Sequence, residues 1–121
     1  MSRDRSVKIL NLHHESYFRS DGHFVYVGRS NARPYHFGNP FTHLKTPTLA
    51  SVQVATREAS VQAYADWLDG KAWHGIEPAR RQWILDQIEI LRRLGDDLVL
   101  GCYCQPLRCH AEIIRERILR P

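Results

Sequence analysis

The chain has 121 residues, and its 17 Lys and Arg against 13 Asp and Glu give a formal net charge of +4. This length is typical of one domain, so we expect a single α/β domain over residues 1–121. The 10% aromatic content and the mixed charges exclude intrinsic disorder. No uncharged apolar run approaches the roughly 20 residues that cross a membrane, and the N-terminus lacks an apolar signal segment. We therefore expect a cytoplasmic protein with no membrane partner.

The N-terminal part of the chain predicts strands followed by a loop. Residues 7–12 begin with a β-branched side chain and partly alternate, and residues 24–28 are rich in strand-forming residues. The Asp21-Gly22 pair between them is a tight-turn signal and favours a hairpin that joins residues 16–19 to residues 23–26. Residues 29–49 are rich in Gly and Pro and predict a long ordered loop, a type of segment that is often functional.

Two helices and a buried strand are predicted next. Thr56 can cap a helix that Gly70 closes, and a second helix has Pro78 in its first turn and Gly95 just past its end. The continuous apolar run over residues 98–103 is typical of a central strand covered on both faces. The side chains expected to face the core from the two helices are Val61, Tyr64, Trp67, Leu68, Trp83, Ile84, Ile88, Ile90 and Leu91.

A final helix is predicted over residues 109–120, with Ile113, Ile114 and Ile118 facing inward. The predicted order is therefore strand, strand, loop, helix, helix, strand, helix. This order indicates an α/β fold, a small single domain with a short mixed sheet and three main helices.

The segment Gly101-Cys-Tyr-Cys-Gln-Pro-Leu-Arg-Cys-His110 lies where a buried strand ends and a helix begins. Open α/β sheets bind ligands at the carboxyl ends of their strands, and a helix N-terminus favours anions. A thiol at Cys109, beside Arg108, loses its proton more easily there. Glu112 is a candidate general base or a hydrogen-bonding partner for the His110 ring, or simply the acid that a first helical turn favours. The position suits a nucleophile, a metal ligand or an anion clamp.

A zinc site is the main alternative for this segment. Cys102, Cys104, Cys109 and His110 supply suitable ligands, but the usual Cys-x2-Cys spacing is absent. The side chains of adjacent helical residues such as Cys109 and His110 diverge by about 100°. Burial as a small apolar side chain explains Cys102 well and the Cys109-His110 pair poorly. We expect no cofactor to be required for folding, with zinc optional, and the clustered cysteines indicate a reducing compartment.

A second group of candidate residues follows the strand predicted at residues 24–28. The guanidinium of Arg29 can hold a phosphate or carboxylate with two hydrogen bonds, and Gly28 allows a ligand to approach closely. Asn39 precedes Pro40 and is therefore extended, so its amide can bind a base edge or a sugar hydroxyl. Alternatively, Asn39-Pro40 only initiates a turn and Arg29 is a surface residue.

These motifs resemble a known family. The segments that carry the resemblance are Tyr26-Val-Gly-Arg29, Gly38-Asn-Pro-Phe41, Leu100-Gly-Cys-Tyr-Cys-Gln-Pro106 and Cys109-His110. Over roughly residues 7–119 the chain is similar to the bacterial and phage domain-of-unknown-function 4326 family. It departs from the family pattern at Tyr103, where members have Trp, and at Ala111-Glu112, where they have Gly-Asp. The resemblance implies no activity, but it places Arg29, Asn39, Cys104, Cys109 and His110 in one site.

We therefore expect a small domain that binds an anionic, nucleotide-like ligand and hydrolyses it or transfers a group on it. The candidate catalytic residues are Cys109, His110 and Glu112, and the candidate ligand-binding residues are Gly28, Arg29, Asn39, Cys104 and Arg108. The alternative is a non-catalytic, zinc-stabilised module that uses its basic surface to bind nucleic acid. A thiol-based redox sensor is a third possibility.

Overall fold

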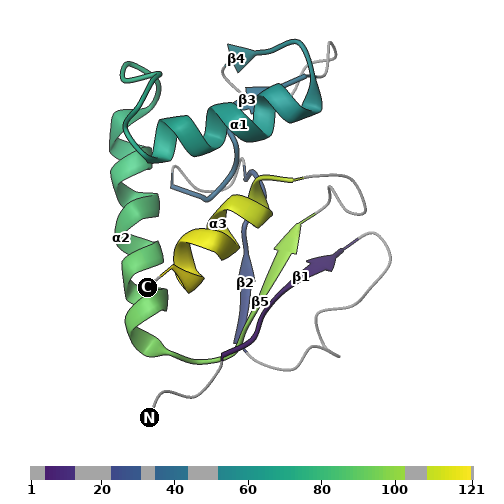
Figure 1. Cartoon of the computed structure of the whole chain (residues 1–121), viewed down its shortest axis with the longest axis vertical. Helices are drawn as coiled ribbons and strands as arrows, with labels where there is room; N and C mark the ends of the chain where they lie inside the picture. Colours follow the sequence, from purple (N-terminus) through teal and green to yellow (C-terminus); the bar gives the residue numbers. More distant parts are fainter. Residues whose placement is uncertain (1–4, 13–22, 31–34, 44–51, 103–108, 121) are drawn as a thin grey trace.

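The computed structural model describes residues 5–12, 23–30, 35–43, 52–102 and 109–120. Its main sheet has three strands in the order β1 (Val7–Asn11), β5 (Leu98–Cys102) and β2 (His23–Tyr26), and β5 pairs in parallel with both neighbours. Figure 1 shows the three strands side by side, with the arrowheads of β1 and β5 at the same end of the sheet. The carboxyl ends of all three strands therefore meet at one edge of the sheet.

Three helices lie in the described part of the chain: α1 (Arg57–Leu68), α2 (Pro78–Leu94) and α3 (His110–Leu119). Helix α3 packs against β1, β5, α1 and α2, and Figure 1 shows it lying across the sheet. Helix α1 also contacts β3 (Phe41–Thr42), which pairs in parallel with β4 (Val52–Gln53). The α/β class, the short sheet and the three helices are thus confirmed.

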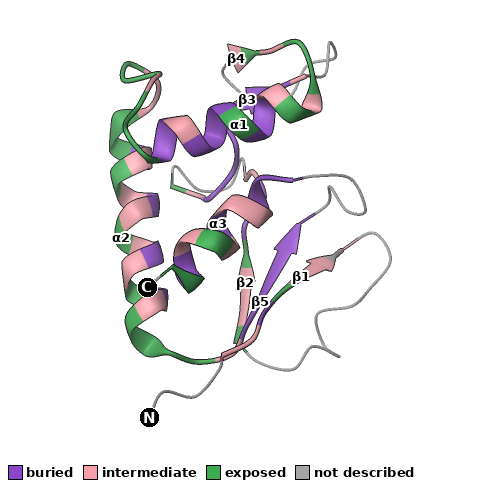
Figure 2. Cartoon of the chain, viewed as in Figure 1, coloured by how far each residue is buried: buried purple, intermediate pink, exposed green. Residues whose placement is uncertain are grey.

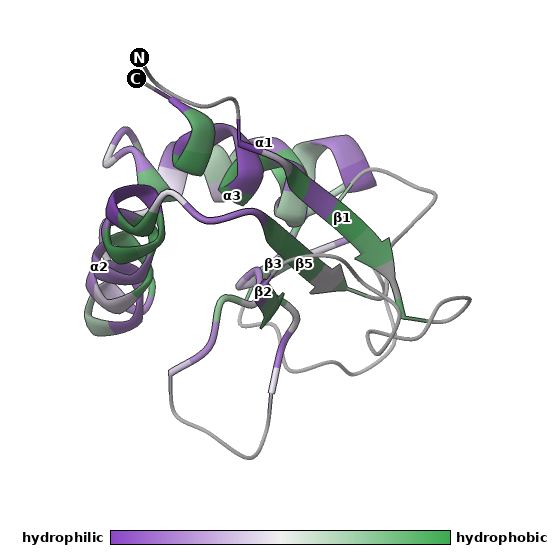
Figure 3. Ribbon diagram, turned by 90° about the horizontal axis from the view of Figure 1, so that it is seen from below, coloured by the Kyte–Doolittle hydropathy of each residue, from purple (hydrophilic) through white to green (hydrophobic). Residues whose placement is uncertain are grey.

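The core lies between the sheet and the helices. All five residues of β5 are buried, as expected of a strand with neighbours on both sides, and Figure 3 shows its apolar character. Figure 2 shows that the buried residues of the helices face inward. The largest fully buried side chains are those of Trp67, Tyr64, Phe41, Leu68, Ile84, Leu98, Leu100 and Ile114. Among the described segments, no helix has the length and apolar character that a membrane crossing requires.

Local sequence signals placed the helix ends correctly. The Thr56 side chain accepts a hydrogen bond from the backbone N–H of Ala59 at 3.0 Å, which caps α1. Helix α2 starts at Pro78 and ends before Gly95, whose φ of 70° is the left-handed conformation that a glycine adopts without strain. These caps confirm the predicted boundaries of both helices.

Two sequence predictions need correction. Ile90, predicted to face the core, is 51% exposed, because it lies about 200° around α2 from the buried Ile88. The segment predicted as a loop over residues 29–49 contains β3, which is too short to leave an alternating pattern in the sequence. The turn predicted at Asp21-Gly22 lies outside the described residues.

The central strand makes a testable packing prediction. A Cβ atom at Gly101 would lie 2.6 Å from two ring carbons of Phe24 and 3.3 Å from Leu12 Cδ1. We expect Gly101→Ala to lower the free energy of unfolding by about 1–3 kcal/mol, because the half-buried Phe24 ring must move away from the new methyl group. Urea denaturation measures this change. Gly75→Ala is the matched control, since a Cβ there meets nothing within 4 Å, and an equal loss in both variants would contradict the prediction.

Candidate functional site

The carboxyl edge of the sheet is joined to the start of α3 by one buried hydrogen bond. His110 Nε2 lies 2.5 Å from the carbonyl oxygen of Val27, the residue that follows β2. Both residues are buried, with exposed fractions of 5% and 0%. Because a carbonyl oxygen can only accept, Nε2 carries the hydrogen, and Nδ1 of the neutral ring is an acceptor. The bond therefore fixes the tautomer of His110 and holds α3 to the end of β2.

The acceptor nitrogen of His110 faces the thiol of Cys109. Cys109 Sγ lies 3.5 Å from His110 Nδ1, and both side chains are buried. The predicted divergence of these side chains is wrong, because Cys109 is the N-cap of α3 and has an extended backbone, with φ −145° and ψ 152°. The N-cap position thus turns the thiol towards the imidazole of the next residue.

Glu112 has a local structural role. Its Oε2 accepts a hydrogen bond from the backbone N–H of Cys109 at 3.0 Å, and the two residues form a capping box at the start of α3. This contact matches the interpretation of Glu112 as a first-turn acid. A role for Glu112 as a general base stays a prediction.

Burial determines the charge of His110. Desolvation is the largest cause that lowers its pKa, the Val27 carbonyl and Cys102 raise it, and the positive charges of Arg29 and Arg80 lower it, with a net pKa of about 4. His110 is therefore neutral at pH 7. A neutral His110 imidazole therefore faces the Cys109 sulfur, with its unprotonated Nδ1 directed at Sγ.

Arg29 is fixed beside this pair. Its Nε donates to the carbonyl oxygen of Asn39 at 2.8 Å and its Nη2 donates to that of Phe41 at 3.0 Å. Both acceptors are backbone carbonyls, and the two bonds fix the orientation of the guanidinium. Arg29 follows Val27 by two residues and is close enough to His110 to lower its pKa. The structure therefore brings Arg29 and the Cys109–His110 pair to the same edge of the sheet.

Asn39 connects the segment that Arg29 holds to helix α1. Its Nδ2 donates to the carbonyl oxygen and to Oγ of Ser60, at 3.1 and 2.9 Å, and its Oδ1 accepts from the backbone N–H of Phe41 at 2.9 Å. The Asn39 side chain is buried. These bonds give Asn39 a positioning role within the protein, and its predicted contact with a ligand stays a prediction.

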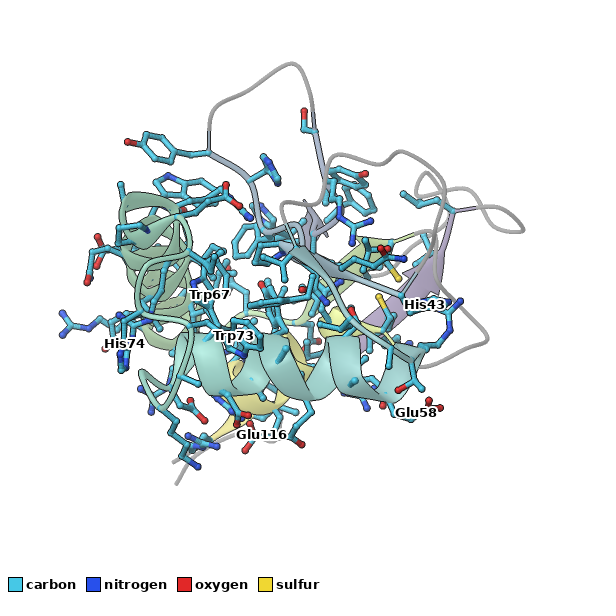
Figure 4. The ribbon with its side chains drawn as sticks, turned by 90° about the horizontal axis from the view of Figure 1, so that it is seen from above. His43, Glu58, Trp67, Trp73, His74 and Glu116 are labelled. Atoms are coloured by element: carbon cyan, nitrogen blue, oxygen red, sulfur yellow. The ribbon has the colours of Figure 1, made fainter. Side chains whose placement is uncertain are left out.

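Two residues with a part in this region were not predicted as site residues. Arg80 is 4% exposed, donates to the carbonyl oxygens of His36 and Gly38 at 2.9 and 2.5 Å, and pairs with Glu77 at 2.9 Å. Its guanidinium carbon lies 5.4 Å from the ring centre of Trp67, which points into the interior in Figure 4. Nothing in the sequence around Arg80 distinguishes it from the other arginines of α2, which are less buried.

The second of these residues is Tyr64, which sequence analysis assigned only to the core. Its hydroxyl donates to the carbonyl oxygen of Phe37 at 2.7 Å, and its ring centre lies 5.0 Å from that of His110. Burial raises the pKa of Tyr64 well above its usual value, so the hydroxyl keeps its proton. Tyr64 therefore packs against His110 and binds the segment next to Arg29 at the same time.

The glycines next to Arg29 allow close packing of protein atoms. A Cβ at Gly28 would overlap the phenol ring of Tyr26, whose hydroxyl donates to the carbonyl oxygen of Arg29 at 2.9 Å. A Cβ at Gly38 would lie 2.6 Å from Arg29 Cγ and 2.7 Å from His36 Nδ1. Gly38 thus lets the chain pass directly against Arg29, and the predicted approach of a ligand to Gly28 stays a prediction.

The described residues provide only some of the ligands that a metal ion needs. Within them, no group of three or more His, Cys, Asp or Glu side chains is placed to hold a metal ion. The 3.5 Å between Cys109 Sγ and His110 Nδ1 nevertheless matches the separation of neighbouring ligands on tetrahedral zinc, given bonds of roughly 2.3 and 2.0 Å. Cys102 is buried at the end of β5, while the candidate residues Cys104 and Arg108 lie outside the described residues.

The family resemblance is confirmed by comparison with known proteins. The model of the DUF4326 family, a domain of unknown function, matches residues 10–120. No curated protein and no solved structure was found to match the chain.

The buried, neutral His110 makes folding sensitive to acid. Its pKa is about 4 in the folded protein against 6.5 for an ordinary histidine, so below pH 6.5 the unfolded chain binds a proton that the folded protein excludes. Stability therefore falls as the pH drops from about 6.5 towards 4, by up to about 1.4 kcal/mol per pH unit. His110→Gln keeps an N–H donor for Val27 but cannot titrate in this range.

The measurement is the free energy of urea unfolding of both proteins between about pH 7 and pH 4.5. Other titrating groups, such as His36, are common to both proteins and cancel in the difference. We expect the wild type to lose stability relative to His110→Gln as the pH falls. A difference that does not change with pH would contradict a buried neutral His110.

Proposed function

The chain belongs to the DUF4326 family, and we propose that it binds a phosphate-bearing, nucleotide-like small molecule at the carboxyl edge of its three-stranded sheet. The observation that carries this proposal is the fixed position of the Arg29 guanidinium beside the N-terminus of α3. A helix N-terminus presents backbone N–H groups and a partial positive charge. An oriented guanidinium next to it adds a full charge with the fork geometry that suits phosphate oxygens.

The electrostatics of the surrounding histidines support an anion site. The pKa of His110 and that of His36 are both lowered, chiefly by burial and also by the charges of Arg29 and Arg80. The two histidines belong to segments far apart in the sequence, and the charges of the same two arginines act on both, while Glu77 opposes the effect at His36. A positive potential attracts a phosphate and repels a cation.

We propose Cys109 as the nucleophile if the bound ligand reacts. The thiol proton would move to His110 Nδ1, the sulfur would bond to an electrophilic carbon or phosphorus atom, and the leaving group would depart with the electron pair and take the proton from His110. Water would then release the product and restore the thiol. A bound anion favours this transfer, because negative charge raises the pKa of the neighbouring imidazole.

The binding proposal is tested with a panel of nucleoside monophosphates, using thermal shift and isothermal titration calorimetry. A ligand at 100 times its Kd should stabilise the fold by about 2.7 kcal/mol. We expect Arg29→Gln to weaken binding at least about tenfold, because an oriented charged donor is lost. Since Arg29 also holds backbone carbonyls, the folded state of this variant is checked first by circular dichroism.

Arg93→Gln is the matched control for this test. It removes the same charge from a side chain that is 81% exposed on α2. We expect its affinity for nucleotides to equal that of the wild type. Equal weakening in both variants, or no binding of any nucleotide to the wild type, would overturn the proposal.

A zinc-stabilised module that binds nucleic acid is the second candidate, and one observation favours it. His110 donates Nε2–H to a backbone carbonyl and points Nδ1 at a thiol, the arrangement typical of histidines that ligate zinc. Elemental analysis of protein purified without added metal distinguishes the candidates. Stoichiometric zinc that is lost in Cys109→Ser would support the module, and folded protein without zinc would exclude it.

A further inference from the structure

The side chain of Tyr35 forms an exposed aromatic surface close to the proposed anion site. Its ring is stacked on the indole of Trp83, with ring centres 6.1 Å apart and planes inclined by 16°, and Tyr35 is 44% exposed. Below it, the buried Phe37 packs edge-on against Trp83, with ring centres 5.2 Å apart. The stack is therefore anchored in the core at one end and ends at a ring in contact with solvent.

Residues 36–38 lead from this stack to the segment that lies against Arg29. Tyr35 precedes His36, whose carbonyl oxygen is bound by Arg80, and Gly38 passes against the Arg29 side chain. Three residues span at most about 11 Å, so Tyr35 and Gly38 lie within that distance of each other. A nucleotide carries the two chemical groups that suit these neighbouring places, a ring for the aromatic stack and a phosphate for the guanidinium.

We propose that Tyr35, supported by Trp83, is the platform on which the base of the nucleotide stacks while its phosphate is held at Arg29. This inference rests on the proposed function and specifies its ligand as a nucleotide, in preference to a sugar phosphate or free phosphate. Aromatic side chains stack on every nucleobase, because each base has a π face. The platform therefore contributes affinity for a base and little discrimination between bases.

The test compares AMP with ribose 5-phosphate, which lacks the base, by isothermal titration calorimetry. We expect the wild type to bind AMP more tightly than ribose 5-phosphate. Tyr35→Ala should weaken AMP binding by about 5- to 150-fold, the range for loss of one stacked base, and leave ribose 5-phosphate binding unchanged. Tyr35→Phe keeps the ring and should keep the affinity for AMP. Ile90→Ala, which removes an exposed apolar side chain from the helix that carries Trp83, is the control.

The outcomes separate this inference from the proposed function. If AMP and ribose 5-phosphate bind the wild type equally, or if Tyr35→Ala binds AMP as the wild type does, the platform is overturned while phosphate binding stands. If neither compound binds the wild type, the proposed function fails and the platform fails with it. An equal loss of both affinities in Tyr35→Ala would indicate a damaged anion site and would also overturn the platform.

Discussion

The structure depends on how the backbone of residues 36–41 satisfies its carbonyl groups. This segment is buried for most of its length and enters a strand only at Phe41, so its carbonyl oxygens need partners from side chains. Arg80 binds the carbonyls of residues 36 and 38, Tyr64 binds that of residue 37, and Arg29 binds those of residues 39 and 41. Leaving one such buried group without a partner costs about 1–3 kcal/mol, so these donors are needed for the path of the segment.

The same contacts account for the electrostatics of the site. Carbonyl oxygens orient a guanidinium, so the bonds that hold the segment also fix Arg29 close to the end of β2. His110 binds the chain only two residues before Arg29 and is neutral, since burial and these arginines lower its pKa. The same structural bonds thus place a neutral imidazole next to the guanidinium groups of Arg29 and Arg80.

The sequence predicted the parts of the fold that local chemistry determines. Thr56, Pro78 and Gly95 act through their own turns, and the helix ends therefore follow from short-range signals. Arg80 could not be identified in the same way, because its burial depends on carbonyls more than 40 positions away. That Arg29 lies near the start of α3 could be predicted only because each of them follows a strand, and the carboxyl ends of parallel strands lie at one edge of a sheet. The contact of Cys109 with His110 was missed because it requires an extended N-cap.

The charge state of the Cys109–His110 pair links binding to any chemistry at the site. With a pKa of about 4, His110 is a weak acceptor for a proton from a thiol. A phosphate placed between Arg29 and the N-terminus of α3 offsets the positive potential that lowers this pKa, and so makes His110 more basic. Under the proposed function, His110 would then be a better acceptor for the Cys109 proton when the anion is bound than when the site is empty.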